Sequence, residues 1–302
     1  MRASIRRLVV IICLFCFWGS STALVANEYT LQADGYELVM WQMDWDSFDH
    51  THSVFQTPEA LLSYVEDCVD QIVELTGNSN WMGRYSTKQI RIATTTRGSY
   101  ADTKIRPTIY LNINWLSSDM APIIHELGHI VAPIDTSRSL EEGFNTYLQF
   151  ALNGMPSVHS FGMDPHLVMQ NILRSHPLTT DEFLSSIGAL ELNSSYAFNQ
   201  ATERSAFYIA SHSFVDYLIH TYGFETFLDV SHSTSKEAYQ LYTGKALETL
   251  QQDWLVYLKT EYTADFTLKD FEASLYATLI EHGWTEDSAS QAAPGFCKQL
   301  AP

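Results

Sequence analysis

Two histidines and a glutamate at helical spacing are the residues of this chain best suited to chemistry. His125 and His129 are four residues apart, and Glu126 directly follows the first of them. An α-helix turns once every 3.6 residues, so the two imidazoles lie one turn apart on one face and can bind a single tetrahedral zinc ion. Glu126 lies at the rim of that face, where its carboxylate can take a proton from water without occupying the metal. The spacing predicts one zinc ion with its own general base.

A catalytic zinc site also needs a third protein ligand and one open position. Downstream, Glu141 and Glu142 are followed by Gly143. With the His-Glu-x-x-His helix, this stretch resembles the gluzincin (peptidase MA-like) metallopeptidases, the clan that includes thermolysin and the zinc aminopeptidases. The resemblance implies that Glu142, on a second helix, is the third ligand. It also implies that Gly143, which lacks a Cβ, lets this helix approach the zinc-motif helix closely.

Other interpretations of Glu142 stay open at this point. Ser139 and Glu142 have the spacing of a capping box, in which the glutamate only satisfies the backbone at the start of a helix. Glu141 and Asp135 are the alternative ligands. No third histidine follows at the metzincin spacing, which argues against that sister clan.

A later helix adds a candidate for transition-state stabilisation. The run 208–218, followed by Tyr222 and Gly223, is similar to the gluzincin helix whose first tyrosine faces the metal. The resemblance implies that Tyr208 donates a hydrogen bond to the oxyanion formed when water attacks a carbonyl. His212, one turn later, is either a second donor, a partner of a ligand or a buried structural histidine. Residues 242–258 are similar to the closing helices of the same group.

The resemblance implies an exported zinc metallopeptidase. The aminopeptidases of the clan carry a Gly-x-Met-Glu-Asn loop, and no such run occurs between Arg97 and Met120, which favours an endopeptidase. A strand between Arg97 and Asn114 is expected to pair with the substrate backbone by edge addition. The alternatives are a non-catalytic surface or binding protein stabilised by zinc, which has no need of Glu126, and a zinc hydrolase of non-peptide amides.

Two further groups of residues have a functional and a structural interpretation. The first group could bind a second metal ion, or it is only a solvated acidic loop. Its residues are His50, His52, Asp44, Asp46 and Asp49. The second group could line a groove that binds sugar or peptide, or it belongs to the hydrophobic core. Its residues are Trp41, Trp45, Trp81 and Trp115.

The first 26 residues are expected to be an export signal. Three arginines precede an apolar stretch from Leu8 to Trp18, and small residues suited to cleavage follow. That stretch is too short to span a bilayer. We therefore expect a secreted, extracytoplasmic protein with no stable membrane insertion after removal of the signal.

Charge and cysteine content narrow the partners. The formal net charge is −18, and loss of the three arginines of the signal takes it to −21, which disfavours nucleic acid and anionic membrane as partners. A peptide or protein substrate is what the resemblance implies. Cys68 and Cys297 are the cysteines that remain. In an oxidising compartment they are expected either to form a disulfide or to be two buried free thiols.

Hydrophobic periodicity predicts an α/β first half and a helical second half. Strands are expected at 36–45, 89–95 and 108–114, with a helix at 58–75. Asp119 is expected to cap the zinc-motif helix. Helices are expected at 140–152, 165–173, 180–190, 203–222, 224–230, 246–260 and 268–282. The resulting fold class is α+β, zincin-like, with an α/β lobe at 27–131 that holds a mixed sheet and the active-site helix, and an all-helical lobe at 132–302.

Overall fold

The computed structural model describes residues 27–51, 53–134, 137–152, 163–175, 201–233, 235–263, 267–281 and 283–300. The chain divides into two compact units, Met1–Ala132 and Pro133–Pro302. The first unit holds a mixed sheet and helices, and the described part of the second is helical, so the fold class is α+β. The expected signal at 1–26 and the expected helix at 180–190 lie outside the described residues.

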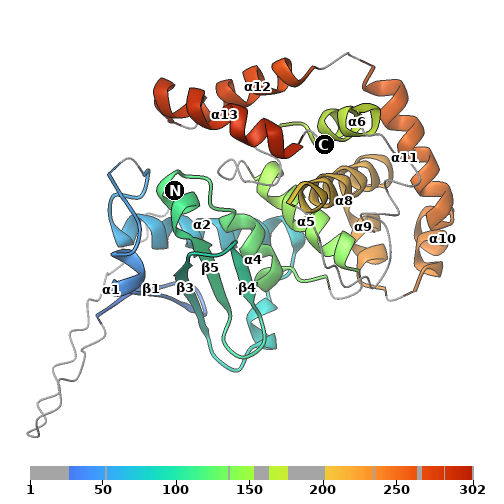
Figure 1. The fold of residues 1–302 in the computed structure, drawn as a ribbon. Helices are drawn as coiled ribbons and strands as arrows, with labels where there is room; N and C mark the ends of the chain where they lie inside the picture. The colour runs from blue at the N-terminus through green and yellow to red at the C-terminus, as the bar shows by residue number, and fades with distance from the viewer. Residues whose placement is uncertain are drawn as a thin grey trace, which may run out of the picture. The chain divides into compact units, whose positions relative to one another are not determined.

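A five-stranded mixed sheet organises the first unit (Figure 1). Its order is β1-β2-β3-β5-β4. The strands are β1 (Glu28–Gln32), β2 (Glu37–Trp41), β3 (Gln89–Thr95), β4 (Tyr100–Asp102) and β5 (Thr108–Asn112). The central strands β2, β3 and β5 are parallel, and β1 and β4 pair antiparallel at the two edges.

The helix α2 (Pro58–Thr76) connects the parallel strands β2 and β3. Local signals set both of its ends. The Thr57 side chain accepts a hydrogen bond from the Ala60 amide at the start, Pro58 takes the first position, and Gly77 ends the helix in the left-handed conformation at φ 68°. The helix packs on β1 and β2 and contacts α4 (Ile123–Val131), which packs on β5 and β4. Both helices therefore cover the same face of the sheet.

Short elements account for most differences from the expected secondary structure in this unit. The strand expected at 36–45 ends at Trp41, where the one-turn helix α1 (Gln42–Trp45) begins. The strand expected at 108–114 likewise ends at Asn112, whose side chain caps α3 (Ile113–Ser117). Periodicity did not predict β1, β4 or the 3₁₀ helix η1 (Trp81–Arg84). Among these, β4 and η1 span too few residues to show a period.

The described part of the second unit contains helices and no strand, as expected. They are α5 (Arg138–Ala151), α6 (Pro165–Ser175), α8 (Ala201–Tyr222), α9 (Phe224–Ser231), α10 (Glu237–Thr243), α11 (Leu247–Glu261), α12 (Leu268–Glu281) and α13 (Glu286–Leu300). The sequence did not predict α10 or α13. The long helix α8 contacts α5, α6, α9, α11 and α13, so it is the centre of the unit.

A buried polar network joins three of these helices. The His166 ring on α6 contacts the Asp216 carboxylate at 2.8 Å through Nε2 and the Ser213 hydroxyl at 2.8 Å through Nδ1. The Trp254 indole on α11 donates to the same hydroxyl at 3.0 Å. Burial alone would raise the pKa of Asp216, but the hydrogen bond and charge of His166 hold that pKa below its usual value. The network stabilises the contacts of α8 with α6 and α11.

Cys68 and Cys297 are both buried free thiols in the structure. Cys68 lies on α2 in the first unit and Cys297 on α13 in the second, and each is 1% exposed. Burial raises the thiol pKa to about 12 at Cys68 and to about 11 at Cys297. Each thiol acts as a small apolar side chain in its own core.

Among the described helices, none combines the length and the apolar composition that a membrane crossing requires.

Candidate metal centre

The helix α4 brings His125, Glu126 and His129 together. One possible ligand atom from each lies within 4.8 Å of those of the others, and this is the one such group among the described residues. His125 is 2% exposed and Glu126 3%, while His129 is half-buried. The two imidazole rings are edge to face, with centroids 5.1 Å apart. Two imidazoles at this spacing can share a zinc ion, and a carboxylate beside them can take a proton from water at such an ion.

Side chains from the first unit hold the C-terminal end of α4. The carbonyls of its last turn lack partners within the helix. The Asn78 side chain donates to the Val131 carbonyl at 2.7 Å, and the Tyr85 hydroxyl donates to the Ile130 carbonyl at 3.0 Å. These bonds and the contact with α2 fix the helix that carries the histidines.

Asp119 does not cap α4, contrary to the expectation. The residue at the N-cap is Pro122, which offers no side-chain cap. Asp119 instead has φ 54°, and its carboxylate accepts hydrogen bonds from the Ser53 hydroxyl at 2.7 Å and the Val54 amide. Burial raises the pKa of this carboxyl, although those hydrogen bonds act to lower it. Asp119 therefore anchors the loop before α2 and not the start of α4.

The outer strand beside α4 is β4, which pairs with β5 on one side. No described strand lies on its other side. Tyr100 of β4 is 45% exposed and stacks on Tyr110 of β5.

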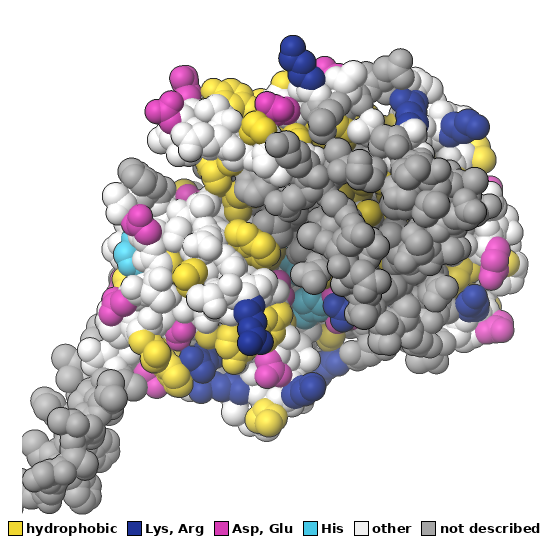
Figure 2. All heavy atoms as spheres, viewed as in Figure 1, with side chains coloured by type: hydrophobic (Ala, Val, Ile, Leu, Met, Phe, Trp, Pro, Cys, Tyr) yellow, Lys and Arg dark blue, Asp and Glu magenta, His cyan; other side chains and the backbone are white. Residues whose placement is uncertain are grey.

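All lysines and arginines in residues 27–132 lie between Arg84 and Arg106. In Figure 2, dark-blue basic side chains gather on one face of the first unit, beside hydrophobic ones.

The helix α5 of the second unit carries Glu142, and the capping-box interpretation of this residue is wrong. The N-cap is Ser137, whose hydroxyl accepts from the Leu140 amide, so Ser139 lies inside the helix. Glu142 is therefore in the second turn and is 2% exposed, whereas Glu141 is half-buried. The fallback ligand Asp135 lies outside the described residues.

Arg138 links Glu142 to Tyr208 within the second unit, and sequence reasoning missed it. Its Nη2 lies 2.5 Å from the Glu142 Oε1, and its guanidinium also hydrogen-bonds the Tyr208 side chain on α8. The two residues that the resemblance singled out there are thus joined by one guanidinium. The Arg–Glu spacing of four residues is a typical helical ion pair and was the available signal.

Gly143 allows a close approach of helices within the second unit, where its partner is α8. A Cβ at this position would lie 2.4 Å from the Ser211 carbonyl oxygen and 2.9 Å from the Val215 Cγ2. Only glycine fits such a backbone contact. The glycine after Glu142 therefore sets the distance between the helices that carry Glu142 and Tyr208.

His212 is buried, with 0% of its surface exposed. Its ring lies edge-on to the rings of Tyr147 and Phe150, at centroid distances of 6.3 and 5.6 Å. Tyr208, four residues earlier, is half-buried. These surroundings favour the structural interpretation of His212, while Tyr208 keeps some contact with solvent.

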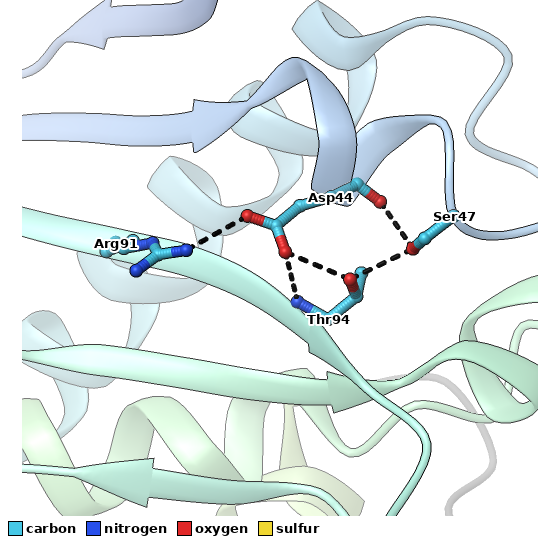
Figure 3. A network of polar contacts seen from close by, with 4 residues as sticks. All are labelled: Asp44, Ser47, Arg91 and Thr94. Carbon is cyan, nitrogen blue, oxygen red and sulfur yellow. Dashed lines mark hydrogen bonds and ion pairs between the residues drawn. The ribbon is translucent and has the colours of Figure 1, made fainter. Parts of the chain in front are cut away.

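The acidic loop of the first unit does not form a second metal group among the described residues. The Asp44 carboxylate binds other protein groups, as Figure 3 shows. It contacts Arg91 at 3.2 Å and accepts hydrogen bonds from the amide and the hydroxyl of Thr94, each at 3.0 Å. Ser47 donates to the Asp44 carbonyl. His50 stacks on Trp45 at 4.1 Å. His52 lies outside the described residues.

The tryptophans act mainly in packing. Trp45 and Trp81 are 7% and 4% exposed, and the Arg91 guanidinium lies 3.6 Å above the Trp41 ring. These contacts favour the core interpretation over a binding groove.

Comparison with models of known families, with curated proteins and with solved structures finds no match for this chain.

Proposed function

We propose that this chain is an exported zinc-dependent peptidase of the gluzincin type that cleaves within peptide chains. The observation that carries the proposal is the group formed by His125, Glu126 and His129 on a helix that is otherwise apolar. The two imidazoles on one face of this helix support a shared metal ion, and the Glu126 carboxylate within 4.8 Å of them supports a base beside it.

In this proposal His125, His129 and Glu142 hold one zinc ion. Zinc, when bound, supplies a Lewis acid that polarises a carbonyl and lowers the pKa of water towards neutrality. Glu126 accepts the proton of the attacking water and passes it to the leaving amine. Tyr208 donates a hydrogen bond to the oxyanion of the substrate. Amide hydrolysis needs a base for the attacking water and a hydrogen-bond donor for the oxyanion, and these residues can supply both.

The choice of Glu142 over Glu141 has support within α5. Glu142 is buried and its carboxylate pairs with a guanidinium, and a carboxylate ligand of zinc must likewise be an anion. Glu141 is half-buried. If Glu141→Ala loses zinc while Glu142→Ala keeps it, the ligand is one residue earlier than proposed.

The edge strand β4 supports a peptide as the substrate. An extended peptide can add to an exposed strand edge through backbone hydrogen bonds. In the first unit β4 lies beside the helix of the histidine pair. Arg97 and Lys104 stand before and after this strand, so we expect the edge to tolerate acidic substrate segments in an otherwise acidic chain.

The test combines zinc analysis with cleavage profiling of the mature protein on a mixed peptide library, with and without chelator. We expect one tightly bound zinc per chain, and its loss in His125→Ala and in His129→Ala. His232→Ala is the matched control, because this histidine is exposed and lies outside the proposed site. Glu126→Gln should keep the zinc and lose nearly all hydrolysis.

Each other outcome selects a different class. Wild-type protein that takes up no zinc when folded with excess metal would overturn the proposal. Zinc binding without cleavage of any library peptide, and with a melting temperature that falls on chelation, would indicate a zinc-stabilised binding protein. Cleavage confined to non-peptide amides would indicate the other hydrolase class.

A further inference from the structure

Arg138 occupies a position that links two functional groups of the second unit. It is the first residue of α5, one turn before Glu142. Its guanidinium contacts the Glu142 carboxylate at 2.5 Å and hydrogen-bonds Tyr208, which belongs to a different helix. One side chain therefore sets the geometry of a proposed metal ligand and of a proposed hydrogen-bond donor.

An ordinary surface ion pair does not account for this arrangement. Pairs at this helical spacing contribute little when both partners are solvated. The Glu142 side chain, however, is 3% exposed, and the Arg138 side chain is 46% exposed. The buried Glu142 carboxylate needs a cationic partner such as the Arg138 guanidinium. The contact of Arg138 with Tyr208 on α8 is an additional one, which a helical pair within α5 does not explain.

The chemistry of the three groups makes the contacts useful. A carboxylate has two oxygens, so a guanidinium at Oε1 is compatible with a metal at Oε2. A guanidinium carries only donors, so the bond to Tyr208 runs from Arg138 to the phenol oxygen. That bond does not use the phenol proton. It polarises the O–H group, which makes the phenol a stronger donor.

We propose that Arg138 is a positioning residue, which orients Glu142 as a zinc ligand and Tyr208 as the donor to the oxyanion. The inference rests on the proposed function. It adds a residue that touches neither the metal nor the substrate and acts through its two neighbours. Partners of this kind commonly change metal affinity or activity ten- to a hundredfold when they are removed.

The first measurement is zinc affinity, by competition with a chromophoric chelator in the mature protein. Arg138→Met keeps the aliphatic stem and removes the donors, and should weaken zinc binding about ten- to a hundredfold. Arg138→Lys keeps the charge and should recover part of the loss. Arg174→Met is the matched control, because Arg174 lies on α6 and donates to the Tyr262 carbonyl. It should leave zinc affinity unchanged.

The second measurement is steady-state hydrolysis at saturating zinc. Arg138→Met should lower kcat and leave KM nearly unchanged, because Tyr208 acts on the transition state. In the Tyr208→Phe background the same substitution should cost much less, since the donor that it orients is already gone. A purely structural ion pair would give additive losses.

The outcomes separate this inference from the proposed function. If wild type binds zinc and cleaves peptide while Arg138→Met matches it in zinc affinity and kcat, the inference fails and the function stands. A lowered melting temperature with unchanged zinc affinity and kcat would also overturn it, as a structural ion pair alone. Absence of zinc from wild type would refute the proposed function first. If Arg138→Met does not fold, Arg138→Lys and Arg138→Gln decide by the same two measurements.

Discussion

Gly143 lies against the backbone of α8, and its replacement by alanine tests the packing of the second unit directly. A Cβ there would lie 2.4 Å from the Ser211 carbonyl oxygen, 2.6 Å from the Ser211 carbonyl carbon and 2.9 Å from the Val215 Cγ2. The first two are backbone atoms of α8, which cannot rotate away as a side chain can. The helices must therefore separate to admit one methyl group.

The magnitude follows from the size of the overlap. Carbon atoms in contact are about 3.5–4.0 Å apart, so the approach is short by roughly 1 Å. Overpacking of this kind costs about 1–3 kcal/mol. Alanine in a helix would by itself contribute about 1 kcal/mol relative to glycine. The expected net loss is about 0–2 kcal/mol, which lowers the melting temperature of a unit of this size by up to roughly 8 °C.

The assay is thermal unfolding of the mature protein, followed by circular dichroism and calorimetry. Gly295→Ala is the matched control, because Gly295 lies in α13 of the same unit and a Cβ there would meet nothing within 4 Å. That substitution should leave stability unchanged or raise it by up to about 1 kcal/mol. If Gly143→Ala stabilises the protein as much as Gly295→Ala does, the close approach of α5 and α8 is refuted.

Three further predictions follow from individual side chains. Tyr208→Phe should keep fold and zinc and lower kcat about a hundred- to a thousandfold, with a much smaller effect from His212→Ala; the reverse order in a steady-state assay would move the donor to the histidine. Cys68 and Cys297 should react with a thiol reagent at pH 8 far more slowly in the native protein than in denaturant, because burial raises both pKa values; no reactive thiol in denaturant without reductant would show a bridge instead. Asp216 has a pKa that is lowered in the folded state, so its contribution to stability is complete above the unfolded-state value of about 3.9 and is lost as pH falls through the folded value. Asp216→Asn should therefore flatten the fall in melting temperature below that pH, and an unchanged profile would contradict the assignment.

Local pattern alone determined several elements of this fold. The strand β3 has the expected bounds, and α2 differs by one residue, because Thr57, Pro58 and Gly77 mark its ends through their own backbone and side-chain chemistry. The histidine pair belongs to the same class. Helical geometry places residues four apart on one face whatever surrounds them, so the spacing was sufficient to predict the group on α4.

Tertiary packing decided the edge strands and the contact partners of several residues, which no local sequence pattern predicts. The edge strands β1 and β4 are three to five residues long and depend on the neighbours that they pair with. Asp119 was suited to a cap by residue type, yet its carboxylate binds Ser53, which is distant in sequence. Gly143 indicated a close helix approach, but only the tertiary structure identified Ser211 on α8 as the partner.

The contact of Arg138 with Tyr208 is another feature that only tertiary packing decided. The sequence offered Arg138 and Glu142 as a helical pair, and nothing in their spacing pointed to α8. Periodicity and capping are properties of neighbouring residues along one chain segment, so the sequence alone can determine them. Which side chains of two separate helices meet depends on how their surfaces interdigitate, and that is settled only when the whole core packs.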